Sequence, residues 1–225
     1  GLNLSQQSGQ ASVTVATINS RDFLNHLLGF DGVLAGLVAI RGFDEQSRQN
    51  IYRERIYDSN NKKWIFGPPS NWDAYKAYRG ILFTELQPKT GFIKLTVRHR
   101  SPEFAKSFLD LVLKEINLLS RERDLIESKE ALDYLEGILS DTFDKDMRVM
   151  LTGMIQSQIK TQMLSKIKDD YVLEPIDKPY LPKERSSPQR TRLVILGTLL
   201  GIIVALMISI FKYYGTKYKF INSSK

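Results

Sequence analysis

The chain has 225 residues, no cysteine and a formal net charge of +7 at pH 7. Its 42% hydrophobic and 25% charged residues are typical of a folded protein and exclude a disordered or collagen-like chain. Without cysteine, disulfides and thiolate chemistry are excluded, and neither a reducing nor an oxidising compartment is favoured. The sequence starts at Gly1 and not at methionine, so we expect a processed chain or a fragment.

The first 61 residues contain one clear helix signal and two segments that are harder to interpret. Residues 11–18 read ASVTVATI, which predicts either a strand or the start of a helix. Residues 20–28 are expected to form a helix, with Ser20 or Asn19 as its N-cap. The charged segment 46–61 is also predicted to be helical.

An amphipathic helix and a β-hairpin are expected next. Residues 72–83 place aromatic and aliphatic side chains at helical spacing. Residues 91–99 alternate apolar and polar side chains as a strand does, and 81–86 is the expected partner strand. The sequence QPKTG at 87–91 predicts the turn between them.

The longest regular feature is a helix expected over 101–168. Ser101 is a suitable N-cap, and Pro102 suits the first helical position. Apolar side chains then recur every three or four residues, and no proline interrupts them. They are Phe104, Phe108, Val112, Ile116, Leu119, Leu132, Leu135, Leu139, Phe143, Met147, Met150, Met154, Ile159, Met163 and Ile167.

Unbroken, this helix would extend on the order of 100 Å at 1.5 Å per residue. Gly137 and Gly153 are its expected weak points, since glycine costs about 1 kcal/mol in a helix. Its apolar stripe needs a partner, either another part of the chain or the same helix in neighbouring subunits. Residues 171–174 could form a further strand after it.

Prolines dominate the next segment, 175–192, which we expect to be a stiff linker. The run 193–211, LVILGTLLGIIVALMISIF, has the length and composition of a transmembrane helix. Gly197 and Gly201 form a GxxxG pattern that favours helix packing, or is coincidental. Much of the net positive charge flanks this run, as expected for anchoring at lipid headgroups. Residues 212–225 would be a short tail.

The sequence contains no pattern that predicts catalysis, a metal site or a cofactor site. His26 and His99, the only histidines, have no metal-ligand spacing, and neither GxxxxGK[ST] nor GxSxG occurs. We also find no motif for DNA or RNA recognition. We therefore expect a protein that is not an enzyme, has no cofactor and binds no nucleic acid.

Several of these features together resemble one protein family. A strand followed by HRSPEFAKSFLDLVLKEIN, then DDYVLEPIDKPYLPKERSSPQR and an apolar run with GTLLG, resembles the polysaccharide co-polymerases, the Wzz-type chain-length determinants of O-antigen. The resemblance extends from about 90 to 211, and more weakly over 11–28. Without a P-loop, the chain resembles the kinase-free members, with the family's first membrane helix expected upstream of Gly1.

The resemblance implies an α+β fold: a periplasmic domain over 1–174 with a membrane-proximal mixed sheet and a very long extended helix, followed by a C-terminal transmembrane helix. It implies homo-oligomers in the bacterial inner membrane that set the length of a surface polysaccharide. The implied partners are the lipid bilayer, a membrane polysaccharide polymerase and the growing lipid-linked glycan. By matching position, the residues implied to matter for positioning and helix packing are Pro175, Pro179, Pro182, Pro188, Gly197 and Gly201.

Two other classes of protein remain open at this level. A tail-anchored coiled-coil tether or membrane scaffold in the cytosol would explain a long helix followed by an apolar run. An enzyme would require a substrate-dependent activity that is lost when His99 is replaced. Accessibility of position 145 from the periplasm would separate the tether from the chain-length regulator.

Overall fold

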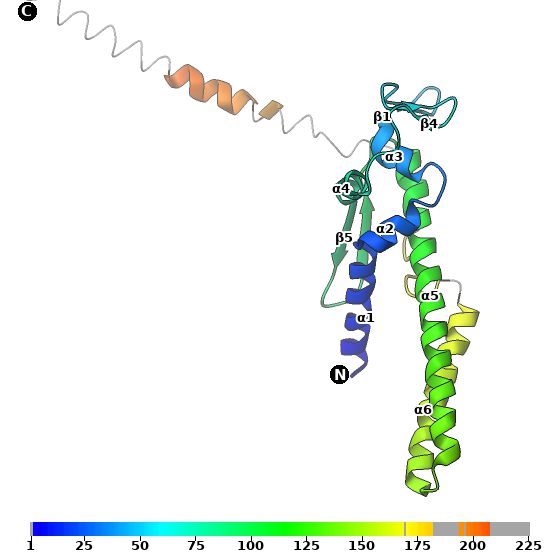
Figure 1. Ribbon diagram of the computed structural model, residues 1–225. Coiled ribbons are helices and arrows are strands. Elements are labelled where there is room, and N and C mark those ends of the chain that lie inside the picture. Colours follow the sequence, from blue (N-terminus) through cyan, green and yellow to red (C-terminus); the bar gives the residue numbers. More distant parts are fainter. Residues whose placement is uncertain (1, 169, 182–193, 196, 208–225) are drawn as a thin grey trace, which may run out of the picture. The chain divides into compact units, whose positions relative to one another are not determined.

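The structure is a computed structural model that describes residues 2–168, 170–181, 194–195 and 197–207. It divides into two units, Gly1–Leu181 and Pro182–Lys225. The helices of the first unit, labelled in Figure 1, are α1 (Leu2–Ile18), α2 (Arg21–Leu27), α3 (Val33–Ala39), α4 (Asn71–Ile81), α5 (Pro102–Asp141) and α6 (Lys145–Ile167). The strands are β1 (Ile40–Asp44), β2 (Gln49–Tyr52), β3 (Tyr57–Asp58), β4 (Lys63–Trp64), β5 (Leu82–Leu86) and β6 (Ile93–Val97).

Side-chain caps fix where several helices begin, because they satisfy backbone N–H groups that have no partner within the helix. The Ser20 hydroxyl accepts a hydrogen bond from the Phe23 amide at 3.1 Å, which confirms the predicted cap of α2. The Ser101 hydroxyl accepts from the Phe104 amide at 3.1 Å, with proline at the first position of α5. The predicted start of the long helix is therefore confirmed as well.

The main core lies where α2, α3, α4 and the first half of α5 meet. Its buried side chains are Ile18, Phe23, Leu24, Leu27, Val33, Leu37, Ala74, Tyr78, Leu82, Phe108, Val112 and Ile116. The rings of Tyr78 and Phe108 meet edge to face with centroids 6.1 Å apart. Burial of Tyr78 raises its pKa, and its hydroxyl donates to the carbonyl of Ile18. This core ties the end of α1 to α4 and α5.

The hairpin of β5 and β6 forms as predicted. The two strands pair antiparallel, from Leu82 opposite Val97 to Leu86 opposite Ile93. The turn needs a residue with positive φ, and Gly91 supplies it at +72°. Residues 11–18 belong to α1, so the helical alternative for that segment is the correct one. The helix expected over 72–83 is α4, whose last expected residues belong instead to β5.

The helix predicted over 46–61 is wrong, because this segment forms strands and turns. Asp44 and Asp58 explain the difference. The Asp44 carboxylate accepts hydrogen bonds from the Gln46 amide and the Ser47 hydroxyl. Asp58 accepts from the amides of Asn60 and Asn61. Such side-chain contacts to nearby backbone favour turns over helix.

The single long helix predicted over 101–168 is also wrong: α5 ends at Asp141, and α6 runs back beside its distal half (Figure 1). Gly137 and Gly153 both remain helical, so neither is the point of the break. At the break, Arg148 donates to the carbonyls of Leu139 and Thr142. Asp144 accepts from the Met147 amide at 2.8 Å and caps α6.

The predicted mixed sheet is wrong as well. Within the described residues, the strands form separate two-stranded antiparallel pairs: β1 with β2, β3 with β4, and β5 with β6. Each pair joins strands that are consecutive in the chain through a short connection, which leads to antiparallel pairing.

The predicted C-terminal transmembrane helix over 193–211 is likewise corrected. Among the residues that the structure describes, no helix has both the length and the apolar character that crossing a bilayer requires. In the second unit, residues 194–195 and 197–207 are helical. Positions 193, 196 and 208–211 of the predicted helix lie outside the described residues.

Candidate assembly surface on the α5–α6 hairpin

The seam between α5 and α6 is narrow and contains small side chains. Ser128 of α5 and Ser165 of α6 are 2% and 0% exposed, and both hydroxyls donate to carbonyls of their own helices. Leu135 and Leu151 are the large apolar side chains of the hairpin that are buried. Serines that satisfy their own polar groups let two helices approach closely, but they bury little apolar area.

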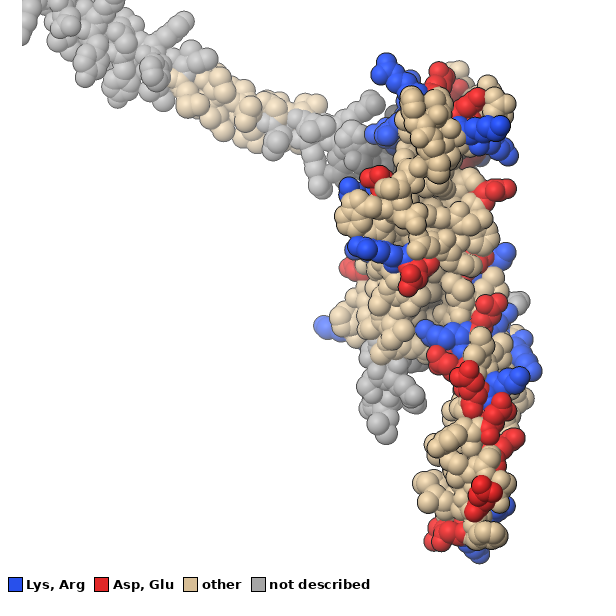
Figure 2. Space-filling view, viewed as in Figure 1, with Lys and Arg blue, Asp and Glu red and all other residues tan. Residues whose placement is uncertain are grey.

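The predicted apolar stripe is exposed in its last part, from Phe143 to Ile167, whereas Leu132, Leu135 and Leu139 of α5 are buried or half-buried. The large apolar side chains exposed on the hairpin are Ile126, Tyr134, Phe143, Met147, Val149, Met150, Met154, Ile159, Met163, Leu164 and Ile167. Met150 and Met163 are each more than half exposed. In Figure 2, uncharged side chains cover much of the hairpin, and acidic side chains gather along one edge. We refer to the exposed apolar residues of α6, from Met147 to Ile167, as the hairpin surface.

The base of the hairpin is held by polar side chains of α5 that bind the segment after α6. Asn117 accepts from the amides of Val172 and Leu173 at 2.8 Å each and donates to the Leu173 carbonyl at 2.9 Å. Arg121 donates to the Lys168 carbonyl at 2.7 Å. The strand considered for 171–174 is absent, because Asn117 occupies the backbone groups that a neighbouring strand would need.

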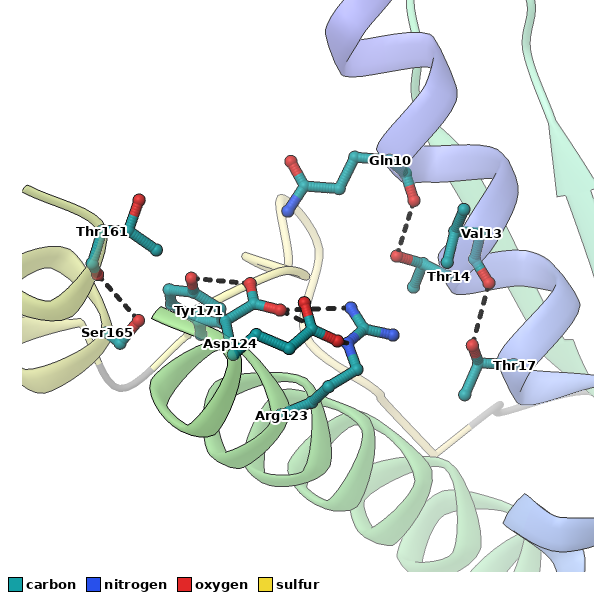
Figure 3. Close-up of polar contacts among 10 residues, drawn as sticks. Gln10, Val13, Thr14, Thr17, Arg123, Asp124, Thr161, Ser165 and Tyr171 are labelled. Atoms are coloured by element: carbon teal, nitrogen blue, oxygen red, sulfur yellow. Dashed lines mark hydrogen bonds and ion pairs between the residues drawn. The ribbon is translucent and has the colours of Figure 1, made fainter. Parts of the chain in front are cut away.

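Tyr171 adds a second contact at this base (Figure 3). Its hydroxyl donates to the Asp124 carboxylate at 2.8 Å, and Arg123 contacts the same carboxylate at 3.3 Å. Burial raises the pKa of Tyr171, so the phenol stays protonated and keeps its role as a donor. These contacts fix the direction in which the hairpin leaves the core.

The two histidines hold structural positions. The His26 imidazole contacts the buried Glu115 carboxylate at 2.7 Å, which joins α2 to α5. Nδ1 of His99 accepts from the Ser101 amide at 3.1 Å, and burial lowers the pKa of His99. Across the described part of the chain, no group of three or more His, Cys, Asp or Glu is placed to hold a metal ion.

The predicted site residues are divided between the two units. Pro175 and Pro179 lie half-buried in the segment that follows Leu173. Pro182 and Pro188 lie outside the described residues. Gly197 and Gly201 are both in the 197–207 helix, and no heavy atom lies within 4 Å of a Cβ added at either one. No helix packing at these glycines is present in the described structure.

Sequence reasoning missed the residues that position the hairpin, above all Asn117, Asp124 and the His26–Glu115 pair. One signal was available: Glu115 and Asn117 flank Ile116 within the most apolar part of α5. Polar groups at core positions are generally paired, so they point to a partner elsewhere in the fold.

No model of a known protein family matches this chain, and no curated protein matches it.

Proposed function

We propose that this chain is a non-enzymatic regulator of the length of a bacterial surface polysaccharide. It acts at the periplasmic side of the inner membrane as a homo-oligomer, together with a membrane polysaccharide polymerase. The polymerase makes the glycosidic bonds on the lipid-linked glycan. The oligomer sets how long the polymerase keeps extending that glycan.

The hairpin surface is the observation that supports an assembling protein. Its side chains extend along α6 over about 30 Å, at 1.5 Å per residue. At 3.6 residues per turn, Met147, Met150 and Met154 share one side of α6. Ile159, Met163 and Ile167 share another side. Burial of apolar surface yields roughly 25 cal/mol per Å², so the two exposed groups favour association with neighbouring molecules. The described chain offers no segment that covers either group. Hairpins of identical copies, packed on both sides, would cover both groups.

The polysaccharide part of the proposal has a different support. It rests on the resemblance of residues 90–211 to the chain-length determinants, which includes the strand before Ser101 and the proline-rich segment. A cytosolic scaffold would use the same hairpin surface but would need neither of these two features. The two classes therefore differ in location and in their effect on the glycan, and both can be measured.

Assembly is tested by placing charges on the hairpin surface. In the full-length chain, replacing Met150 and Met154 by glutamate should convert a large oligomer into smaller species in native mass spectrometry. Lys89→Glu, in the β5–β6 turn, is the matched control and should leave the mass unchanged. A parent chain that is a single protomer in membranes would overturn the assembly part of the proposal.

The glycan role is tested in a polymerase-positive strain. Deleting the gene should change the distribution of glycan lengths on a gel, and the parent gene should restore it. Lys145→Cys supplies a single thiol, since the chain has no cysteine of its own. A membrane-impermeant maleimide added from the periplasm should label it. An unchanged ladder, or labelling only after lysis, would contradict the proposal and favour the cytosolic scaffold.

A further inference from the structure

A second feature lies far from the hairpin, in residues 40–66, which we call the β-module. It contains the β1–β2 and β3–β4 pairs, and an aromatic cluster holds it together. Tyr57, 8% exposed, lies at its centre, with ring centroids 5.4 Å from Tyr52 and 5.0 Å from Trp64. This packing fixes Trp64 and therefore the direction of the chain that follows it.

Two large apolar residues directly after Trp64 are exposed to solvent. Ile65 is 51% and Phe66 is 87% exposed. The backbone at this point is held, because the Ile65 amide donates to the Ile56 carbonyl at 3.0 Å. Gly67, with φ of +87°, then turns the chain into Pro68 and Pro69. The β-module thus presents an aromatic tip on a defined backbone.

Basic side chains outnumber acidic ones in the β-module, with six Lys or Arg against four Asp or Glu in residues 40–66. The exposed cations Arg53, Arg55, Lys62 and Lys63 form no ion pair with any residue that the structure describes. Asp58, opposite Lys63 in the β3–β4 pair, keeps its negative charge, because hydrogen bonds from Asn61 and Asn60 lower its pKa. In Figure 2, Lys and Arg side chains lie around this end of the first unit, with Asp and Glu side chains among them. The tip therefore presents both apolar and cationic groups to the same solvent region.

We infer that the tip of the β-module binds the surface of an anionic lipid bilayer. Phe66 and Ile65 enter the boundary between headgroups and acyl chains, Trp64 lies at headgroup level, and Lys62 and Lys63 contact anionic headgroups. Tryptophan prefers this interface, and basic residues near an anionic membrane are each attracted to it. This contact does not depend on the proposed function, since a membrane scaffold would use it equally.

The size of the tip favours a lipid surface over a protein partner. A stable protein interface buries about 800 Å² on each side and has a broad apolar centre with a polar rim. The exposed apolar part of this tip is two adjacent side chains on one turn. Shallow insertion of an aromatic side chain between flanking lysines matches the layered chemistry of a membrane interface.

The chain has only two tryptophans, which permits a direct test. In the full chain, Trp72→Phe leaves Trp64 as the only indole, and Trp64→Phe leaves Trp72. Each variant is diluted from detergent into vesicles of brominated phosphatidylcholine, with or without phosphatidylglycerol. We expect bromine to quench Trp64 about threefold more strongly than Trp72, and the quenching of Trp64 to increase with anionic lipid.

Charge variants separate this contact from any other attachment to the vesicle. Lys62→Glu with Lys63→Glu, in the Trp72→Phe background, should reduce the anionic-lipid-dependent quenching on the order of tenfold, as molar salt should. Lys89→Glu is the matched control and should have no effect. Equal quenching of both tryptophans, or no response to anionic lipid, would overturn the inference. So would shielding of Trp64 from acrylamide by an oligonucleotide or by chain assembly without lipid.

Discussion

The two halves of α5 have the same helical periodicity but different surroundings. In the first half, Phe108, Val112 and Ile116 are 2%, 0% and 0% exposed, because α2, α4 and the β5–β6 hairpin enclose them. In the second half, Leu135 is 6% exposed and Leu132 and Leu139 are half-buried beside α6. Ile126 and Tyr134, which lie outside the stripe, are 59% and 69% exposed. One half completes a core within the chain, whereas the other is covered by α6 along its stripe alone and leaves other apolar side chains exposed.

This difference shows how far the apolar stripe of a helix can predict the packing around it. Periodicity indicates which face of a helix avoids water, but it does not specify what covers that face. In the first half, the covering elements follow from the chain itself. In the hairpin, α6 covers only a narrow seam. Substitutions that compare the two regions therefore test the interpretation directly.

The largest contrast is expected between Phe108→Ala and Met154→Ala. Phe108 is fully packed, so its truncation leaves a cavity and should lower the free energy of unfolding by about 3–5 kcal/mol. Met154 is 49% exposed, and its truncation should change that free energy by at most about 0.5 kcal/mol. Urea denaturation followed by circular dichroism, at a concentration where the chain does not assemble, measures both. Equal losses would show that the hairpin surface is covered within one chain.

A second contrast uses glycine. A Cβ added at Gly36 of α3 would overlap the ring of Phe104, so Gly36→Ala should destabilise the chain by about 1–3 kcal/mol. At Gly137 of α5, nothing lies within 4 Å of the added atom. Gly137→Ala should therefore stabilise the hairpin by up to about 1 kcal/mol, through helix propensity alone. Thermal unfolding of the two variants compares them, and shifts of the same sign would be inconsistent with the packing described here.

The sequence predicted local features better than the contacts between distant segments. The caps at Ser20 and Ser101 and the turn at Gly91 were predictable because they depend on neighbouring residues. The break after Asp141 was missed because the apolar period continues across it, although Asp144 is of a residue type favoured at the N-cap. The membrane helix was predicted from the length, composition and flanking charges of 193–211, and no helix among the described residues meets the requirements for spanning a bilayer.

The candidate site was also predictable only in part, because its contacts join segments that are distant in the sequence. The apolar residues from Met147 to Ile167 could be recognised from the sequence, but which of them stay exposed depends on how α6 packs against α5. The polar clamp at Asn117 joins residues more than fifty positions apart. No local pattern specifies such a pairing.

Asn117 tests whether the hairpin is positioned from its base. Asn117→Ala removes the partners of two amides and one carbonyl, which should cost about 1–3 kcal/mol locally. Hydrogen exchange at Val172 and Leu173 should accelerate, while amides in α2 keep their protection. Asn117→Asp is the matched control, because it retains the acceptor for both amides and should preserve most of their protection. Unchanged exchange in Asn117→Ala would mean that other contacts hold this segment.

The smallest expected effect is a pH dependence that belongs to the core region alone. Burial lowers the pKa of His99 from its ordinary value of 6.5, and Nδ1 accepts a hydrogen bond from the Ser101 amide. The unfolded chain therefore binds this proton at a higher pH than the folded chain does. Its stabilising contribution is present above pH 6.5 and is lost as the pH falls through 6.5 toward the lowered pKa. His99→Asn, which retains a polar acceptor but does not titrate in this range, should show a shallower decline of the urea midpoint. A parent chain and a variant with the same slope would show that protonation of His99 does not weaken the start of α5.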